Sequence, residues 1–108
     1  MKHAKLKMPP LPINIGKERK LTDIDGKKQH FIVRDEIVRL QSAYPRKAIY
    51  LQRIEFKNDG RIQLRLGYYM IGTKPRMAGK WVWGQYATMI PAEDFRAIIR
   101  EASDKGWI

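Results

Sequence analysis

Two stretches of alternating apolar and polar residues, joined by a short turn sequence, constrain the fold of this chain more than any other feature. The second stretch, residues 61–71, reads RIQLRLGYYMI and has an apolar side chain at every other position. A period of two is typical of an antiparallel strand that buries one face. Residues 48–57 (AIYLQRIEFK) precede it, and Asn58-Asp59-Gly60 predicts a hairpin with a three-residue loop and a left-handed Gly60.

The length of that loop decides which side chains face one another. With three loop residues, Ile54 pairs with Leu64 and Phe56 with Ile62 on the buried face. The open face then carries two like-charge pairs, Lys57 with Arg61 and Arg53 with Arg65. Each pair costs about 0.2–1 kcal/mol, so an anion bound there is one explanation. The other is that the long side chains splay into water.

The flanking segments add a third strand, a further hairpin and a short helix. Residues 80–90 (KWVWGQYATMI) continue the meander, with Trp81 and Trp83 on one side. Asp25-Gly26 predicts a hairpin nearer the N-terminus. In residues 33–44, apolar side chains recur at helical spacing and predict a short helix that ends before a proline.

The C-terminal segment predicts a second, amphipathic helix. It begins PAEDF, with Pro91 suited to the first position and two acidic residues in the first turn. Gly106 is the expected C-terminal cap, and Trp107 is expected to fold back onto the preceding turn. The apolar stripe is Phe95, Ile98, Ile99 and Ala102.

These elements define an α+β fold. We expect an antiparallel β-meander of three or more strands, packed on one face by the helix at 33–44 and by the C-terminal helix. Residues 1–16, rich in proline and lysine, are expected to be a basic flexible arm. Residues 17–108 are expected to form a single α+β domain.

The charge of the chain indicates a polyanionic partner. Its 22 basic and 11 acidic residues give a net charge of +11, which favours nucleic acid over a merely basic surface. The excess lies in the arm and the middle of the chain, because residues 90–108 hold three cations and four acids. No apolar run approaches a membrane span and no signal peptide is evident, so we expect a cytoplasmic protein without membrane contact.

The candidate binding residues combine cations with aromatic rings. Bases would stack on the rings while the basic side chains hold phosphates. For Trp81 and Trp83 the alternative is packing in the core, which small domains often fill with aromatic residues. The expected nucleic-acid-binding residues are Arg53, Lys57, Arg61, Gln63, Arg65, Tyr69, Lys74, Arg76, Lys80, Trp81 and Trp83.

Catalysis finds little support in the sequence. The chain has no cysteine and two histidines, His3 and His30, which excludes thiolate metal sites and leaves little for a histidine-based one. We therefore expect no enzymatic activity, no metal and no cofactor. Glu55 and Lys57 have the acid-x-Lys spacing of one family of metal-dependent nucleases, and a divergent nuclease is kept as the third function.

The stretch YATMIPAEDFRAIIREA, residues 86–102, resembles the last strand-to-helix step of the positive cofactor four family of single-stranded-DNA-binding transcriptional coactivators. The resemblance covers about residues 47–105. It implies a curved sheet that grips single strands and a helix that serves in dimerisation, hence a possible homodimer.

The first function expected from the sequence is therefore nucleic-acid binding, with single-stranded DNA or RNA favoured. The alternative is an accessory or protein-interaction subunit that docks through its Trp-rich face, with the basic arm adding weak affinity for nucleic acid.

Overall fold

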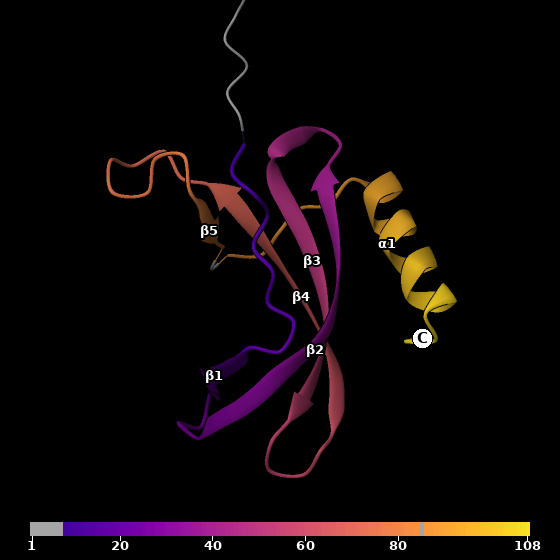
Figure 1. Ribbon diagram of the computed structural model, residues 1–108. Coiled ribbons are helices and arrows are strands. Elements are labelled where there is room, and N and C mark those ends of the chain that lie inside the picture. The colour runs from indigo at the N-terminus through magenta and orange to yellow at the C-terminus, as the bar shows by residue number, and fades with distance from the viewer. Residues whose placement is uncertain (1–7, 85) are drawn as a thin grey trace, which may run out of the picture.

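The computed structural model describes residues 8–84 and 86–108 and consists of a five-stranded antiparallel sheet with one helix packed on it (Figure 1). The strands lie in chain order, which confirms the predicted α+β meander. They are β1 (Glu18–Thr22), β2 (Lys28–Gln41), β3 (Tyr44–Phe56), β4 (Ile62–Ile71) and β5 (Trp81–Trp83), followed by α1 (Ala92–Asp104).

The helix predicted for residues 33–44 is wrong, because this segment is most of β2 and the turn after it. Arg34 is an extra residue in β2, inserted between the pairs Val33–Ile54 and Asp35–Arg53. Such a bulge reverses the alternation of faces along a strand. Val33 and Ile37 are therefore buried on opposite faces of the sheet, although their spacing of four reads as one face of a helix.

The predicted β3–β4 hairpin forms, but its register is wrong by one residue. Four residues, 57–60, make the loop: Phe56 donates its backbone N–H to Arg61, and Gly60, at φ 73°, donates to Phe56. The extra loop residue shifts every pairing. The like-charge pairs do not form, since Arg53 lies opposite Leu64 and Arg65 opposite Gln52.

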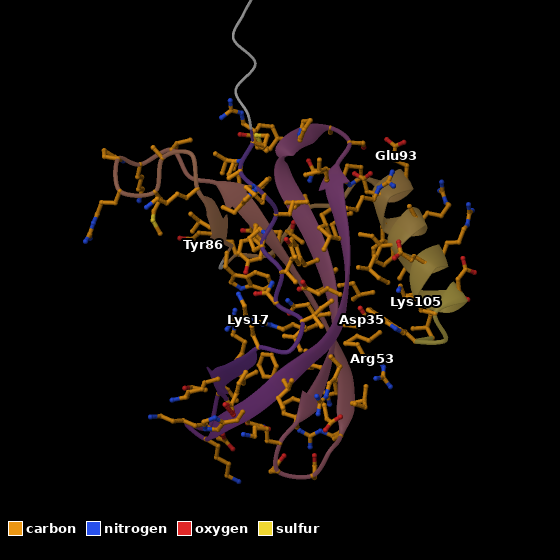
Figure 2. All side chains as sticks on the ribbon, viewed as in Figure 1. Lys17, Asp35, Arg53, Tyr86, Glu93 and Lys105 are labelled. Carbon is orange, nitrogen blue, oxygen red and sulfur yellow. The ribbon has the colours of Figure 1, made fainter. Side chains whose placement is uncertain are left out.

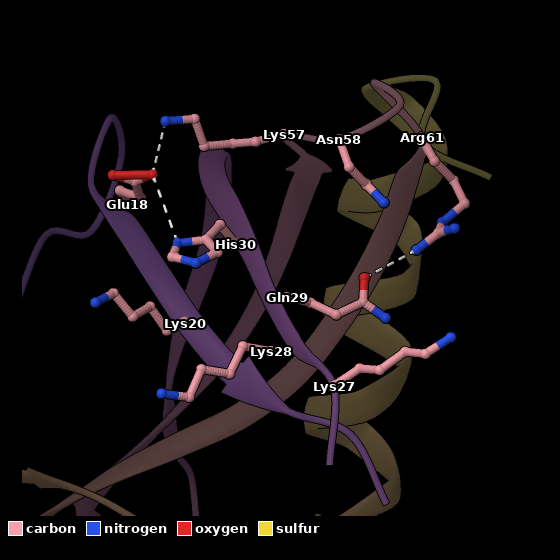
Figure 3. Close-up of a pocket in the computed structure, with 9 residues that line it drawn as sticks. All are labelled: Glu18, Lys20, Lys27, Lys28, Gln29, His30, Lys57, Asn58 and Arg61. Carbon is pink, nitrogen blue, oxygen red and sulfur yellow. Dashed lines mark hydrogen bonds and ion pairs between the residues drawn. The ribbon is translucent and has the colours of Figure 1, made fainter. Parts of the chain in front are cut away.

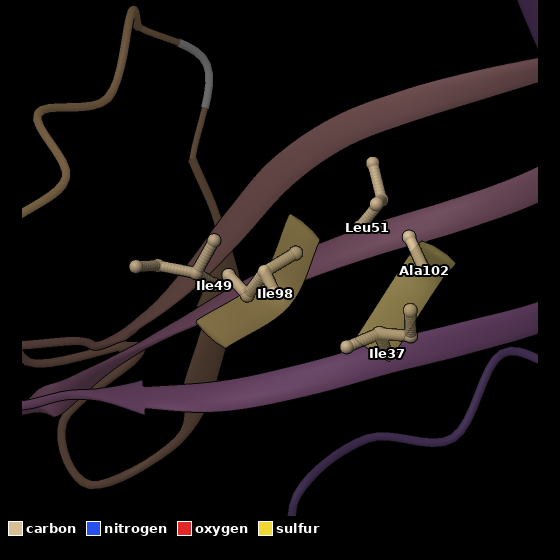
Figure 4. Close-up of a cluster of buried hydrophobic side chains, with 5 residues drawn as sticks. All are labelled: Ile37, Ile49, Leu51, Ile98 and Ala102. Atoms are coloured by element: carbon tan, nitrogen blue, oxygen red, sulfur yellow. The ribbon is translucent and has the colours of Figure 1, made fainter. Parts of the chain in front are cut away.

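The two faces of the sheet pack differently. We call the side that α1 covers the helix face. Its buried cluster comprises Ile37, Ile49, Leu51, Ile98 and Ala102 (Figure 4). The opposite side is the strap face, named for residues 8–16, the strap, which run along it (Figure 1). Strand alternation places Tyr50 there, and its hydroxyl donates to the Pro12 carbonyl at 2.6 Å.

The helix α1 follows the prediction closely at its C-terminal end. Gly106, at φ 76°, caps it, and the Trp107 N–H donates to the Ala102 carbonyl at 2.8 Å. Of the predicted apolar stripe, Ile98 and Ala102 are buried but Phe95 stays 44% exposed. Asp94, one helical turn before Ile98 on the same side of α1, is also buried, and its carboxylate accepts a hydrogen bond from Arg39 of β2.

The apolar face of β4, predicted to be buried, is largely uncovered. Ile62, Leu64, Leu66 and Met70 are 36–44% exposed on the helix face. The single helix lies over the cluster on β2 and β3, and the second helix that would have covered β4 does not exist. This row of side chains, which we call the β4 stripe, is a partly exposed apolar surface that no helix or loop of residues 8–84 and 86–108 covers.

A second buried cluster lies on the strap face, at the end where β1 and β2 meet in the predicted hairpin. It comprises Phe31, Val33, Ile54 and Phe56, with Leu21 packed against it. The β1–β2 turn contains Gly26 at φ 85°, as the Asp25-Gly26 pair predicted. The two long strands therefore bury opposite faces in their two halves, and the bulge at Arg34 lies at the crossover.

Candidate nucleic-acid interface

The register divides the expected binding residues between three places. Arg53 and Lys57 share the β3 alternation of Ile49 and Leu51, so they do not belong to the strap face. Figure 2 shows Arg53 on the side of α1 and Tyr86 on the side of β5. Exposed positions of the β4–β5 loop hold Lys74, Arg76 and Lys80. The strap face brings together Arg61, Gln63, Arg65, Tyr69, Trp81 and Trp83.

The ring of Trp83 is part of the packing of the strap face. It meets Tyr69 edge-on at 5.0 Å between ring centroids and Tyr50 at 6.5 Å. It lies over Gly67, where a Cβ would collide with the indole. Trp83 is nevertheless only partly buried. Trp83 therefore fits both expectations in part: one part of its ring packs on the sheet, as a core residue would, and another part faces solvent, where a base could reach it.

Two arginines lie on aromatic rings of this face. The Arg65 guanidinium is 4.6 Å from the Trp83 ring centroid and 5.1 Å from that of Phe31. Arg61 lies 4.2 Å from the centroid of Phe56. In each pair the guanidinium itself lies over the ring, which is a cation–π arrangement, and Arg65 is only partly exposed. Burial lowers the pKa of Arg65, which nevertheless keeps its positive charge because an arginine pKa starts so high.

A polar network beneath the rings fixes their positions. The Glu36 carboxylate accepts from the backbone and side chain of Asn14 at 2.8 and 3.0 Å, and from Gln52 at 2.9 Å. The Asn14 side-chain oxygen accepts from Arg19 at 2.9 Å and from the Tyr69 hydroxyl at 3.2 Å. Because these partners are mutually satisfied, the face is preorganised rather than adaptable.

The strap occupies part of the same face. The Trp81 indole N–H donates to the Pro9 carbonyl at 2.9 Å, and Tyr50 bonds Pro12. Burial, with the nearby Glu36 charge, raises the pKa of Tyr50, so its hydroxyl stays protonated and can donate. Residues 8–16, assigned by sequence to the arm, thus lie along the sheet; residues 1–7, with Lys2, Lys5 and Lys7, are outside the described range.

The open part of the face is at its β5 edge. A hollow of about 400 Å³, which we call the edge hollow, is lined in part by Arg65, Trp83 and Tyr86. Tyr86 is 84% exposed. The sequence suggested a longer third strand with Tyr86 on the side away from the tryptophans, but β5 ends at Trp83. The sequence therefore did not predict that Tyr86, an exposed aromatic residue, lines the same hollow as Trp83 and Arg65.

A second site missed by the sequence is a basic hollow at the other end of the sheet, between the β1–β2 hairpin and the β3–β4 loop (Figure 3). The two adjacent lysines of the segment KKQH, residues 27–30, indicate a local cluster of positive charge, but the sequence analysis used them only in the net charge. Lys57, one of the expected residues, lies here rather than on the strap face. The charged lining of the basic hollow is Glu18, Lys20, Lys27, Lys28, Lys57 and Arg61.

The residues considered for a nuclease are engaged elsewhere. Glu55 accepts two bonds from Arg34, at 3.3 and 3.2 Å. Lys57 pairs with Glu18 at 2.8 Å, and this contact lowers the pKa of the Glu18 carboxyl. Among residues 8–84 and 86–108, no three His, Cys, Asp or Glu side chains lie close enough to hold one metal ion.

Comparison with known proteins gives no match to a family model, to a curated protein or to a solved structure. The resemblance to the positive cofactor four family therefore stays a prediction. Within the described part of the chain, no helix has the length and apolar character needed to cross a membrane.

Proposed function

We propose that this protein binds single-stranded nucleic acid at the β5 edge of the strap face. The observation that carries the proposal is the edge hollow, where Trp83 and the exposed Tyr86 flank the guanidinium of Arg65. Two rings and a cation around one hollow offer stacking surfaces for bases and a charge for phosphate. The net charge of +11 supplies the long-range attraction.

The geometry favours single strands over duplexes. Stacking on Trp83 or Tyr86 requires the flat face of a base, which a duplex conceals between its neighbours. The strap already lies over Trp81, so the bound strand follows the open side, from the edge hollow along β4 towards Gln63 and Arg61. The proposal includes no enzymatic step and no cofactor, and it places the protein in the cytoplasm.

The test replaces Tyr86 with alanine and measures fluorescence anisotropy of labelled single-stranded DNA, single-stranded RNA and duplex DNA across a salt series. We expect Tyr86→Ala to weaken single-strand binding by about 5- to 100-fold, because one stacked base contributes roughly 1–3 kcal/mol. Thermal stability should stay unchanged, since Tyr86 is 84% exposed. Affinity should also fall steeply as salt rises.

The matched control is Tyr44→Ala, which removes a 42% exposed tyrosine at the start of β3. It should leave affinity unchanged. Equal, weak binding of all three nucleic acids, unaffected by Tyr86→Ala, would refute the proposal and reduce the charge to a non-specific attraction. The Trp-rich face would then be examined as a protein-docking surface, the alternative function.

We further propose that two copies associate through the β4 stripe. Two chains of charge +11 repel each other, so association requires a surface away from the cations. The β4 stripe meets this requirement in part: it is apolar and shares the helix face with α1, whose segment 90–108 carries no excess of positive charge, although Arg53 lies directly opposite Leu64. The resemblance to the positive cofactor four family also implies a dimer, but one formed through the C-terminal helix rather than through the β4 stripe.

Light scattering tests the association. The wild type should have twice the chain mass of 12.7 kDa, and Leu64→Lys should be monomeric because it puts a charge into the apolar contact. The control Ile24→Lys alters a fully exposed isoleucine in the β1–β2 turn and should remain dimeric. A monomeric wild type, or a Leu64→Lys variant that stays dimeric, contradicts the proposal.

A further inference from the structure

The basic hollow is a concave surface of about 660 Å³ at the end of the sheet. It forms where the β1–β2 hairpin and the β3–β4 loop meet, and two interactions link these turns: Lys57 donates its backbone N–H to the His30 carbonyl at 2.9 Å, and its ammonium pairs with Glu18 at 2.8 Å. The hollow therefore lies between two turns that a backbone hydrogen bond and an ion pair hold together (Figure 3).

The charges of the hollow are out of balance. Five cations line it and Glu18 is the one carboxylate in the lining. That carboxylate is already engaged by Lys57, with the His30 imidazole 4.0 Å away. Among the described residues, Lys20, Lys27 and Lys28 form no ion pair. The ammonium ends of Lys20 and Lys28 lie on one side of β2 and that of Lys27 on the other (Figure 3). Several cations around one hollow raise its affinity for a multivalent anion above that of isolated lysines.

The lining points to phosphate rather than to a base. Apart from the His30 imidazole, no aromatic side chain of the described residues lines the hollow. The ring of Phe56 is nearby but is 5% exposed and lies under Arg61. A base finds only the His30 imidazole in the described lining, whereas a phosphate finds ammonium donors from Lys20 and Lys28.

The position of the hollow favours a terminal phosphate over a phosphodiester within the strand. The edge hollow is lined by residues 65–68 of β4 and the basic hollow by Arg61, so four to seven residues separate them, a span of about 13–23 Å at strand geometry. A bound nucleic-acid strand that starts in the edge hollow and follows β4 towards Arg61 reaches the basic hollow, which lies at that end of the sheet. A terminal phosphate is a dianion near neutral pH and suits this excess of cations better than a singly charged phosphodiester.

We propose that the basic hollow binds the terminal phosphate of the nucleic-acid strand whose bases stack in the edge hollow. This inference rests on the proposed function and adds to it a preference for phosphorylated ends. It also gives the bound strand a fixed polarity, because the edge hollow lies beside the middle of β4 and the basic hollow lies at its start.

The experiment titrates the protein into three internally labelled oligothymidylates, long enough to span both hollows. They carry a 5′-phosphate, a 3′-phosphate, or hydroxyls at both ends. We expect one phosphorylated form to bind about tenfold tighter than the hydroxyl form. The double variant Lys20→Gln, Lys28→Gln should abolish this preference. The matched control, Arg96→Gln with Arg100→Gln on the exposed side of α1, removes the same charge and should retain it.

Each other outcome contradicts the inference. Equal affinity for the three oligonucleotides overturns the terminal-phosphate site but leaves single-strand binding intact. A Lys20→Gln, Lys28→Gln variant that weakens all three equally shows only general attraction, and also overturns it. If none of the three oligonucleotides binds, both the proposed function and this inference are refuted.

Discussion

Replacing Gly67 with alanine is expected to lower both the stability of the fold and its affinity for single strands. The backbone at Gly67 does not have positive φ, so any residue fits its conformation. The space is the obstacle, because the Trp83 indole lies where the Cβ would be. Pushing this ring away should cost about 1–3 kcal/mol in unfolding free energy. Because Trp83 lines the edge hollow, single-strand affinity should fall by about 5- to 100-fold.

Urea unfolding and anisotropy on the same preparation measure the two effects. The control is Ile98→Val, which removes one methyl group from the helix-face cluster and should cost about 0.5–1.5 kcal/mol. It leaves the strap face untouched, so its affinity should equal that of the wild type. A Gly67→Ala variant with wild-type tryptophan emission and wild-type affinity would show that the indole does not lie over Gly67 in solution.

Replacing Asp94 with alanine should detach the start of α1 from the sheet. The buried carboxylate accepts from Arg39 at 2.7 Å, and from the backbone N–H and hydroxyl of Ser42 at 2.9 and 3.1 Å. The variant leaves these donors without their acceptor. We expect a loss of about 2–3 kcal/mol, less than for a fully buried ion pair because Arg39 is partly exposed to water. Urea unfolding measures it.

The same carboxylate makes stability depend on pH. Burial alone would raise the pKa of Asp94, but the bonds from Arg39 and Ser42 outweigh it and hold the pKa below the ordinary 3.8. A lowered folded-state pKa adds stability above the unfolded value, and this contribution is lost as pH falls through the folded value. The difference between wild type and Asp94→Asn should therefore be present at neutral pH and vanish in acid; a constant difference contradicts it.

The sequence predicted the elements whose signals are local. The hairpins at Gly26 and Gly60 and the helix capped by Gly106 depend on residues within a few positions of each turn or end. The false helix at 33–44 and the wrong β3–β4 register each came from one extra residue that the pattern did not reveal. The bulge at Arg34 turned a strand pattern into a helical spacing, and a fourth loop residue at Lys57 moved the β3–β4 register. Composition carries no sign of either insertion.

The candidate site was predicted only in part, because a site depends on which faces share a surface. Alternation along one strand placed Arg61, Gln63, Arg65 and Tyr69 on one face, as the structure does, but it left open whether Trp81 and Trp83 share that face, which the β4–β5 pairing decides. Arg53 and Lys57 were misplaced by the register error. Tyr86 and the lysines of the basic hollow were missed, since their positions depend on where β5 ends and on how two distant turns meet.

The order of the strands has a consequence for how the protein is made. Every strand pairs with the one before it in the chain, so each ladder closes over a short loop, at little cost in entropy. The sheet can therefore grow in the direction of synthesis. The bond from Trp81 to Pro9 is different, because it joins residues 72 positions apart. The bond at Pro9 can therefore form only after β5 has been synthesised, whereas the strap's bonds to Glu36 and Tyr50 need only β2 and β3.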